Sequence, residues 1–283
     1  MAAHDFSRIS PTAYYTGQVW YRHGLSHPAL ETRAGKWLFR ALQPFMLASR
    51  AFSGLALEDA LIARHRCLEY LLNRAVDGGV VGQVIEIGAG LSPRGVRMMR
   101  RFQHRKLVYI EGDLPAMAAA KRERLSSVDA LRPGHHVVEL DALADAGARS
   151  LEEVAREYLD PRVGTAILTE GLINYFDGPT AATLWQRIAR VLRGYPSGVY
   201  MSDMYHRDEV DHVPGAAPFA TVLAAFTRGR VYIHFADETE ANGALAQAGF
   251  ARATNWRVSE LAEAVGLTTT QTQSPVRVVE AWV

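Results

Sequence analysis

The chain has 283 residues, of which 48% are hydrophobic and 22% charged, and its formal net charge is +1. This composition is typical of a soluble globular protein, and a charge so near zero excludes nucleic-acid binding by bulk electrostatics. Its single cysteine, Cys67, excludes an internal disulfide framework. No apolar leader begins the sequence and no run is long enough to span a bilayer, so we expect a cytoplasmic protein that does not bind membranes.

The first part of the chain, residues 1–78, is rich in aromatic side chains and lacks strand patterns. Apolar residues at helical spacing over 57–76 lead into Asp77-Gly78-Gly79, which predicts a helix and its end. We interpret residues 1–78 as a helical, aromatic cap on a main domain of residues 79–283. Within the main domain, residues from about 204 to 230 read as an irregular insertion.

From residue 79 onward, strand and helix patterns alternate. Strands are expected at Gln83–Ile87, Leu107–Glu111, His136–Leu140, Thr165–Thr169, Gly198–Asp203 and Val276–Val283. Helices are expected at Met117–Leu125, at Leu151–Tyr158, at Thr180–Leu192, and from an Asp237/Glu240 capping box to Gly249. The alternation predicts an α/β fold with a Rossmann-like, doubly wound, mainly parallel sheet. In such sheets a ligand binds beyond the carboxyl ends of the strands.

The most informative segment is the glycine-rich turn Glu86-Ile-Gly88-Ala89-Gly90, which follows the first expected strand. Glycine adopts positive φ and lets a backbone approach a ligand closely, so the turn predicts a cofactor. Pro93 stands where a dinucleotide fingerprint needs its third glycine, and the Gly-Lys-Ser/Thr of a phosphate loop is absent. What remains is typical of enzymes that use S-adenosylmethionine (AdoMet). The alternative is an ordinary tight turn that binds nothing.

Charged residues near the expected strand ends match what AdoMet needs. Glu111 and Asp113 can accept hydrogen bonds from ribose hydroxyls, although Asp113 is equally suited to cap the next helix. Asp141 can accept a hydrogen bond from the adenine amino group. The planar fork of Arg64, on the helix before the first strand, matches the methionine carboxylate, unless this side chain simply faces solvent.

Five motifs make the chain similar to a known family. They are IGAGLSPR (87–94), YIEGDLP (109–115) followed by Lys121-Arg122, TEGLINYF (169–176), SPTAYYTG (10–17) and WYRHGLS (20–26). Together they resemble the leucine carboxyl methyltransferase family, and within it the tetracenomycin polyketide methyltransferase type, over most of residues 10–205.

The resemblance implies AdoMet as the methyl donor. It assigns cofactor binding to Arg64, Glu86, Gly88, Ala89, Gly90, Glu111, Asp113, Asp141, Ala142 and Glu170. In these terms Arg64 binds the methionine carboxylate and Glu170 lies near the methionine amine, while Tyr175 orients an acceptor carboxylate. The chain departs from the family at Ala142, usually a larger residue, and at Ser92, often an aspartate.

The acceptor decides whether the reaction needs a base. A carboxylic acid, with a pKa of about 4, is already ionised at neutral pH, whereas a phenol, at about 10, is not. The motif TEGLINYF offers Tyr175 and Asn174 as catalytic hydrogen-bonding groups but no histidine. This favours a carboxylate as the acceptor. A base for a phenol would have to come from His23, His27 or His206.

Three functions follow: an O-methyltransferase that esterifies a small or polyketide-like acid, a phenol or hydroxyl O-methyltransferase, and a non-catalytic AdoMet-binding protein. Acceptor-binding candidates are Tyr14, Tyr15, Trp20, Tyr21, Tyr175 and His206. The four aromatic residues of the cap can instead pack it on the sheet. We expect no metal, although residues 206–212 contain potential ligands, and the sequence leaves a homo-oligomer open.

Overall fold

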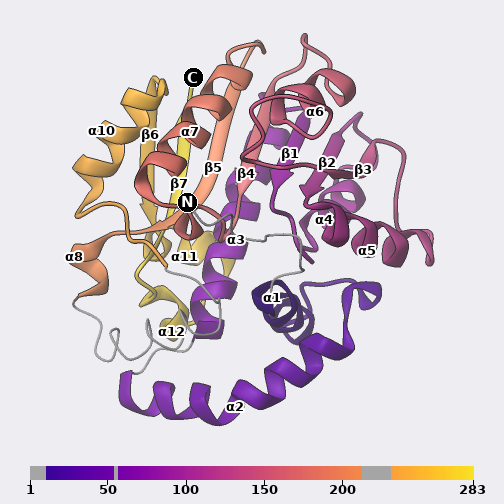
Figure 1. Ribbon diagram of the computed structural model, residues 1–283. Coiled ribbons are helices and arrows are strands. Elements are labelled where there is room, and N and C mark those ends of the chain that lie inside the picture. Colours follow the sequence, from indigo (N-terminus) through magenta and orange to yellow (C-terminus); the bar gives the residue numbers. More distant parts are fainter. Residues whose placement is uncertain (1–10, 54–56, 212–230) are drawn as a thin grey trace. The chain divides into compact units, whose positions relative to one another are not determined.

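The computed structural model describes residues 11–53, 57–211 and 231–283 (Figure 1). The chain divides into two compact units, which we call the first unit (residues 1–41 and 83–160) and the second unit (residues 42–82 and 161–283). The long helix α2 (Arg33–Ser53) belongs partly to each. The division into a cap and a main domain at residue 78 stays a prediction.

The first unit contains three parallel strands with helices packed on them. Its strands, in the order β3-β2-β1, are β1 (Gln83–Ile87), β2 (Val108–Asp113) and β3 (His135–Glu139). The α-helices that follow β1 in this unit are α4 (Arg94–Arg101), α5 (Pro115–Ser126) and α6 (Leu151–Tyr158). Helices α4 and α5 both contact β2 and β3.

The N-terminal segment of the first unit is helical, as predicted. It forms α1 (Pro11–Arg22) and the short 3₁₀ helix η1 (Pro28–Leu30). Gly17 of α1 lies so close to Leu91, which follows the glycine-rich turn, that an added Cβ would be 3.0 Å from the leucine Cβ. Leu91 also belongs to a buried cluster with Leu30 and Met117. The backbone around the turn is thereby held by hydrophobic packing.

The second unit contains four strands in the order β4-β5-β7-β6. They are β4 (Thr165–Thr169), β5 (Gly198–Tyr205), β6 (Arg252–Arg257) and β7 (Val276–Trp282). Strands β4 and β5 are parallel, and β7 is antiparallel to both β5 and β6. Its helices are α3 (Leu57–Asp77), α7 (Gly178–Leu192), α8 (Arg207–Val210), α10 (Glu238–Ala248), α11 (Val258–Val265) and α12 (Thr269–Thr272).

Strand β5 shows that helices cover both faces of the sheet in the second unit. Successive side chains of a strand point to opposite faces. Tyr200 accepts a hydrogen bond from Trp185 of α7, whereas Asp203 accepts one from Arg64 of α3. Helix α7 also contacts α10, and α3 contacts α11 and α12 (Figure 1). The expected α/β class, with a mainly parallel sheet, is confirmed.

Some expected elements change in detail. Strand β2 runs on to Asp113 and β5 to Tyr205. Asp237 caps α10 and Gly249 ends it at φ 108°, as expected, but Glu240 accepts from the N–H of Ala236 and not from that of Asp237.

The end of the chain holds elements that the sequence patterns did not predict. Strand β6 was missed because most of its side chains are polar and at least partly exposed, so it lacks the alternation of a half-buried strand. The short helix α8 forms at the start of the expected irregular insertion, whose residues 212–230 lie outside the described part. Among the described helices, none is long and apolar enough to cross a membrane.

Candidate active site

The glycine-rich turn of the first unit adopts the backbone geometry that its sequence predicts. Gly88 has φ 66° and Gly90 has φ 48°, values that favour glycine. The N–H of Ala89 donates to the carbonyl oxygen of Gly112 on β2 at 3.1 Å. The N–H of Gly90 donates to Oδ2 of Asp113 at 2.6 Å. The turn is thus tied to the end of the neighbouring strand.

Asp113 supports this turn and does not cap a helix. It is the last residue of β2, its Oδ1 accepts from the N–H of Leu114 at 2.8 Å, and the N-cap of α5 is Leu114. The expectation that Asp113 is a helix cap is therefore wrong. Burial raises the pKa of Asp113, although the two backbone N–H groups oppose this shift. The side chain is half-buried, and a carboxylate has about four lone-pair sites, so two backbone bonds leave room for ribose hydroxyls.

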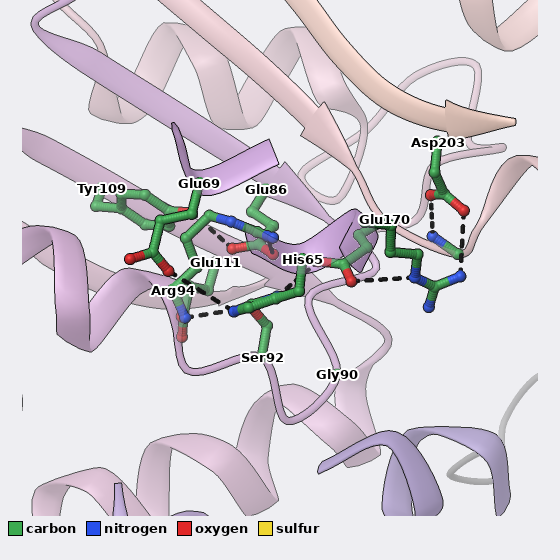
Figure 2. A network of polar contacts seen from close by, with 12 residues as sticks. His65, Glu69, Glu86, Gly90, Ser92, Arg94, Tyr109, Glu111, Glu170 and Asp203 are labelled. Atoms are coloured by element: carbon green, nitrogen blue, oxygen red, sulfur yellow. Dashed lines mark hydrogen bonds and ion pairs between the residues drawn. The ribbon is translucent and has the colours of Figure 1, made fainter. Parts of the chain in front are cut away.

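Glu86, expected at the cofactor, is buried in a polar network with Arg94 and Tyr109 (Figure 2). Its oxygens accept from Nη1 of Arg94 at 2.5 Å and from the hydroxyl of Tyr109 at 2.6 Å. Burial raises the pKa of Tyr109, and the adjacent Glu86 carboxylate adds to this. We correct the assignment of Glu86: its side chain joins β1 to α4 and β2, so only its backbone borders the turn.

The side chain of Glu111 is likewise buried inside the first unit. Its carboxylate lies 3.0 Å from Nζ of Lys121 and 3.6 Å from Nε2 of His135, and all three side chains are buried. Burial alone would raise the pKa of Glu111, but Lys121 and His135 outweigh it and lower the pKa. A Cβ at Gly95 of α4 would clash with the same carboxylate, so the site is enclosed. The predicted ribose role of Glu111 does not fit this placement.

Asp141 and Ala142 lie in the loop that follows β3, and both are half-buried. Oδ1 of Asp141 accepts from the N–H of Leu143 at 2.9 Å, and its own N–H donates to the carbonyl oxygen of Arg149. These bonds hold the loop that carries Asp141 in shape.

In the second unit, Arg64 pairs with Glu170, a residue that Figure 2 shows near Asp203. Nε of Arg64 donates to Glu170 at 3.1 Å, and Nη1 donates to Asp203 at 3.1 Å. Burial disfavours the charge of Arg64, but Asp203 and Glu170 outweigh it and raise the pKa above the ordinary arginine value. Arg64 is buried, so the alternative of a solvent-facing helical charge is wrong.

Asp203 is the member of this cluster that sequence reasoning missed. It is 2% exposed, and its Oδ1 accepts from the N–H of Gly171 at 2.6 Å. Gly171 has φ 65°, and a Cβ there would be 2.7 Å from Nη2 of Arg64, so the glycine is needed twice. The available signal was an acidic residue near the end of strand five, the same rule that selected Glu170.

The turn after Glu170 carries the two predicted catalytic residues. Asn174 and Tyr175 lie in the 3₁₀ helix η2 (Ile173–Tyr175), where Asn174 is buried and Tyr175 half-buried. The segment 231–235 runs beside it. The N–H of Tyr232 donates to the carbonyl oxygen of Asn174 at 2.8 Å, and Nε2 of His234 lies 3.2 Å from that of Ile173.

The cap residues expected at the acceptor divide into two groups. Tyr15 and Trp20 are buried, and Tyr15 stacks on Phe39 at 5.9 Å between ring centroids, so these two pack the first unit and are not an acceptor wall. Tyr14 and Tyr21 are half-buried and stay predictions.

Three histidines were expected as possible bases. Nδ1 of His27 accepts from the N–H of Ala29 and caps η1, whereas His23 is exposed. His206 is buried, and burial lowers its pKa, with Arg277 adding to the shift.

Cys67 is also buried, which raises its pKa to about 12 and fits the expected apolar role. Within the described ranges, no three histidine, cysteine or acidic side chains gather as a metal site.

The residues fit AdoMet, one group in each unit. The first unit offers a close-approach glycine turn and a carboxylate at the end of β2, as a nucleoside needs. The second unit offers buried charges of both signs, as an amino-acid zwitterion and a sulfonium need. Among the described residues, a Cβ added at Gly90 would meet only the Cβ of Ala13, at 3.5 Å, and the carbonyl oxygen of Gly88, at 4.0 Å.

The fold is that of class I methyltransferases. A protein of the DUF574 family from Streptomyces avermitilis has a TM-score of 0.64 at 12% identity, with 97% of this chain and 99% of that chain covered. A methyltransferase from Thermobifida fusca has a TM-score of 0.60 at 12% identity, with 98% and 96% covered. At such low identity these likenesses show the fold alone.

The family follows from the sequence. The leucine carboxyl methyltransferase model matches residues 27–189, and the chain belongs to this family. It is 30% identical over 167 residues to an S-adenosyl-L-methionine-dependent methyltransferase of Frankia alni, with 57% of this chain covered. The chain spans about half the length of that curated relative, 56%. The expected family and its cofactor, AdoMet, are thereby confirmed.

Proposed function

We propose that this protein is an AdoMet-dependent O-methyltransferase that forms a methyl ester on the carboxylate of a small or polyketide-like acceptor. The family match and the fold support methyl transfer. Bound AdoMet supplies an electrophilic methyl group on its sulfonium sulfur. The protein's task is to align the acceptor oxygen with that methyl group and to exclude water.

In this proposal the first unit binds the adenosine part. The turn Gly88–Gly90 lets the backbone approach the nucleoside, and Asp113 accepts hydrogen bonds from the ribose hydroxyls. Asp141 accepts one from the adenine amino group. In the second unit, Glu170 binds the methionine ammonium, and Arg64 presents a permanent positive charge to the methionine carboxylate.

The observation that favours an acid as acceptor is the composition of η2. It places the amide of Asn174 and the hydroxyl of Tyr175 four and five residues after Glu170, and both can donate hydrogen bonds. An acceptor carboxylate is already ionised at neutral pH, so it needs donors that orient it and no base. Half-buried Tyr14 and Tyr21 are the remaining cap candidates for contact with an apolar acceptor body.

The test is a mass-spectrometric screen with methyl-labelled AdoMet against aromatic acids and phenols. We expect label to be transferred to an acid and released by mild alkali, because esters hydrolyse and aryl ethers do not. Alkali-stable label on a phenol would replace this function with the second one below. AdoMet binding without transfer to any acceptor would favour a non-catalytic protein.

A second candidate function, methylation of a hydroxyl or phenol, is favoured by His234. The carbonyl oxygen of Ile173 can only accept, so Nε2 of His234 must carry the proton that it donates. Nδ1 then keeps its lone pair, and burial lowers the pKa of His234, so the ring is neutral at physiological pH. The structure thus brings a histidine to η2, the turn after β4, although the sequence of that turn contains none.

The pH dependence of the variant His234→Gln separates these two functions. For a carboxylate acceptor we expect a rate near that of the unchanged enzyme, flat from pH 6.5 to about 9, since no proton must be removed. For a hydroxyl acceptor the variant would lose roughly 10²- to 10⁴-fold in kcat. In that case the unchanged enzyme would lose activity only as the pH falls through the lowered pKa of His234. Glutamine can still donate to Ile173, so a loss of folding is not expected.

A further inference from the structure

Helix α2 presents an exposed tryptophan between two exposed arginines. Trp37 is 68% exposed, although tryptophan is one of the largest hydrophobic side chains. Arg33 and Arg40, about one helical turn before and after it, are exposed too, and this spacing places all three on one face of the helix. They lie in the part of α2 that belongs to the first unit. We call Arg33, Trp37 and Arg40 the α2 surface.

Packing of the first unit does not use the α2 surface. The contacts that hold α2 are made by its other face, where Phe39 is buried, stacks on Tyr15 and lies 4.6 Å from the guanidinium of Arg22. In the part of the chain that the structure describes, no hydrogen bond, ion pair or ring contact involves the side chains of the α2 surface. Tryptophan and arginine are the residues that most often dominate the energetics of protein interfaces. The α2 surface therefore has the composition of a docking site.

The charge of this region selects an acidic occupant. Residues 11–53 contain a single acidic residue, Glu31, against the basic residues Arg22, Arg33, Lys36, Arg40 and Arg50. Glu31 already pairs with Lys36 at 2.8 Å. Two copies of the chain that met here across a twofold axis would bring like charges together, which is unfavourable. A second copy is therefore a poor occupant, and a negatively charged partner is a good one.

The small size of the α2 surface decides among the acidic partners. A nucleic acid is bound through many phosphates, about six to ten for strong binding, whereas this surface offers two arginines. A membrane needs more apolar material, since even one myristoyl chain binds with only about 10⁴ M⁻¹. Trp37 and Leu47 are the only exposed large hydrophobic side chains described in α2. A protein interface, by contrast, can depend on one well-placed tryptophan.

We propose that the α2 surface docks an acidic protein, with Trp37 as the anchor and with Arg33 and Arg40 paired with carboxylates of the partner. The indole supplies a large and rigid contact area, and the planar guanidinium groups match carboxylates with two parallel hydrogen bonds. The partner would present an apolar pocket rimmed by aspartate or glutamate. The α2 surface contains none of the residues assigned to the cofactor or the acceptor, so the inference is independent of the proposed function.

The test is fluorescence anisotropy of the full chain with a labelled helical peptide in which pairs of glutamates alternate with pairs of leucines. We expect the peptide to bind, and Trp37→Ala to weaken binding by roughly tenfold or more, as the loss of a hot-spot residue does. A second peptide, with serines in place of the leucines, keeps the charge and should bind equally to both proteins. Arg33→Glu/Arg40→Glu should weaken binding of both peptides, and less so at high salt, because its effect is electrostatic.

The matched control is Arg100→Glu/Arg132→Glu, which makes the same change of net charge at two exposed positions elsewhere in the first unit. We expect this control to bind the leucine-containing peptide like the unchanged protein. No binding of that peptide, unchanged affinity in Trp37→Ala, or equal weakening in the control would overturn the inference. So would tighter binding of duplex DNA or of phosphatidylglycerol vesicles that is lost in Trp37→Ala, because it would assign the α2 surface to another class of partner.

Discussion

Replacing Arg94 with alanine is expected to lower the free energy of unfolding by about 3–5 kcal/mol, because the change leaves the buried carboxylate of Glu86 without its cation. Neither side chain is exposed by more than 1%, so water cannot take over the lost bond. Tyr109 would remain as a neutral donor only. The check is equilibrium unfolding in urea.

Two further variants make this result specific. Arg100→Ala lies on the same helix but is exposed, so it should change the free energy of unfolding by no more than about 0.5 kcal/mol. The double variant Arg94→Met/Glu86→Gln removes both charges and should be less destabilised than Arg94→Ala alone. Equal stability of Arg94→Ala and Arg100→Ala would contradict the buried ion pair.

Asp113→Ala is expected to weaken AdoMet binding by about a hundredfold or more, since two hydrogen bonds to a charged acceptor contribute about 1.5–3 kcal/mol each. The variant also removes the hydrogen bond that the N–H of Gly90 donates to Oδ2 of Asp113 at 2.6 Å, a bond that holds the turn. Calorimetric titration with AdoMet measures the change. Asp145→Ala, an exposed aspartate of the same unit, should bind AdoMet like the unchanged protein. Equal affinity in the two variants would remove Asp113 from the ribose site.

The sequence predicted the backbone of the site because local rules determine it. Positive φ at Gly88 and Gly90 follows from glycine in a turn between strand and helix. The rule that ligands bind at the carboxyl ends of parallel strands led to Asp113 and Glu170. These residues have the expected places at the ends of β2 and β4.

The roles of the acidic side chains could not be predicted in the same way, because they depend on partners distant in sequence. Glu111 and Asp113 are two residues apart on one strand, yet Lys121 and His135 bury the first while Gly90 holds the second. Asp203 was missed because its importance lies in Arg64, 139 residues earlier.

His234 shows the same limit of local patterns. The TEGLINYF motif contains no histidine, and that absence argued for a carboxylate acceptor. The histidine reaches Ile173 from 61 residues later in the chain. Only the tertiary contact brings this ring to η2, which carries Asn174 and Tyr175.

The proposed function requires that Asp113 bind the ribose of AdoMet and that Arg64 and Glu170 bind its amino-acid part. A crystal structure of the protein with S-adenosylhomocysteine tests it most directly. We expect both ribose hydroxyls within hydrogen-bond distance of Asp113, and the amino-acid part at Glu170 and Arg64. A ligand bound with Asp113 still bonded only to Gly90 and Leu114, and with Glu170 and Arg64 out of its reach, would contradict it.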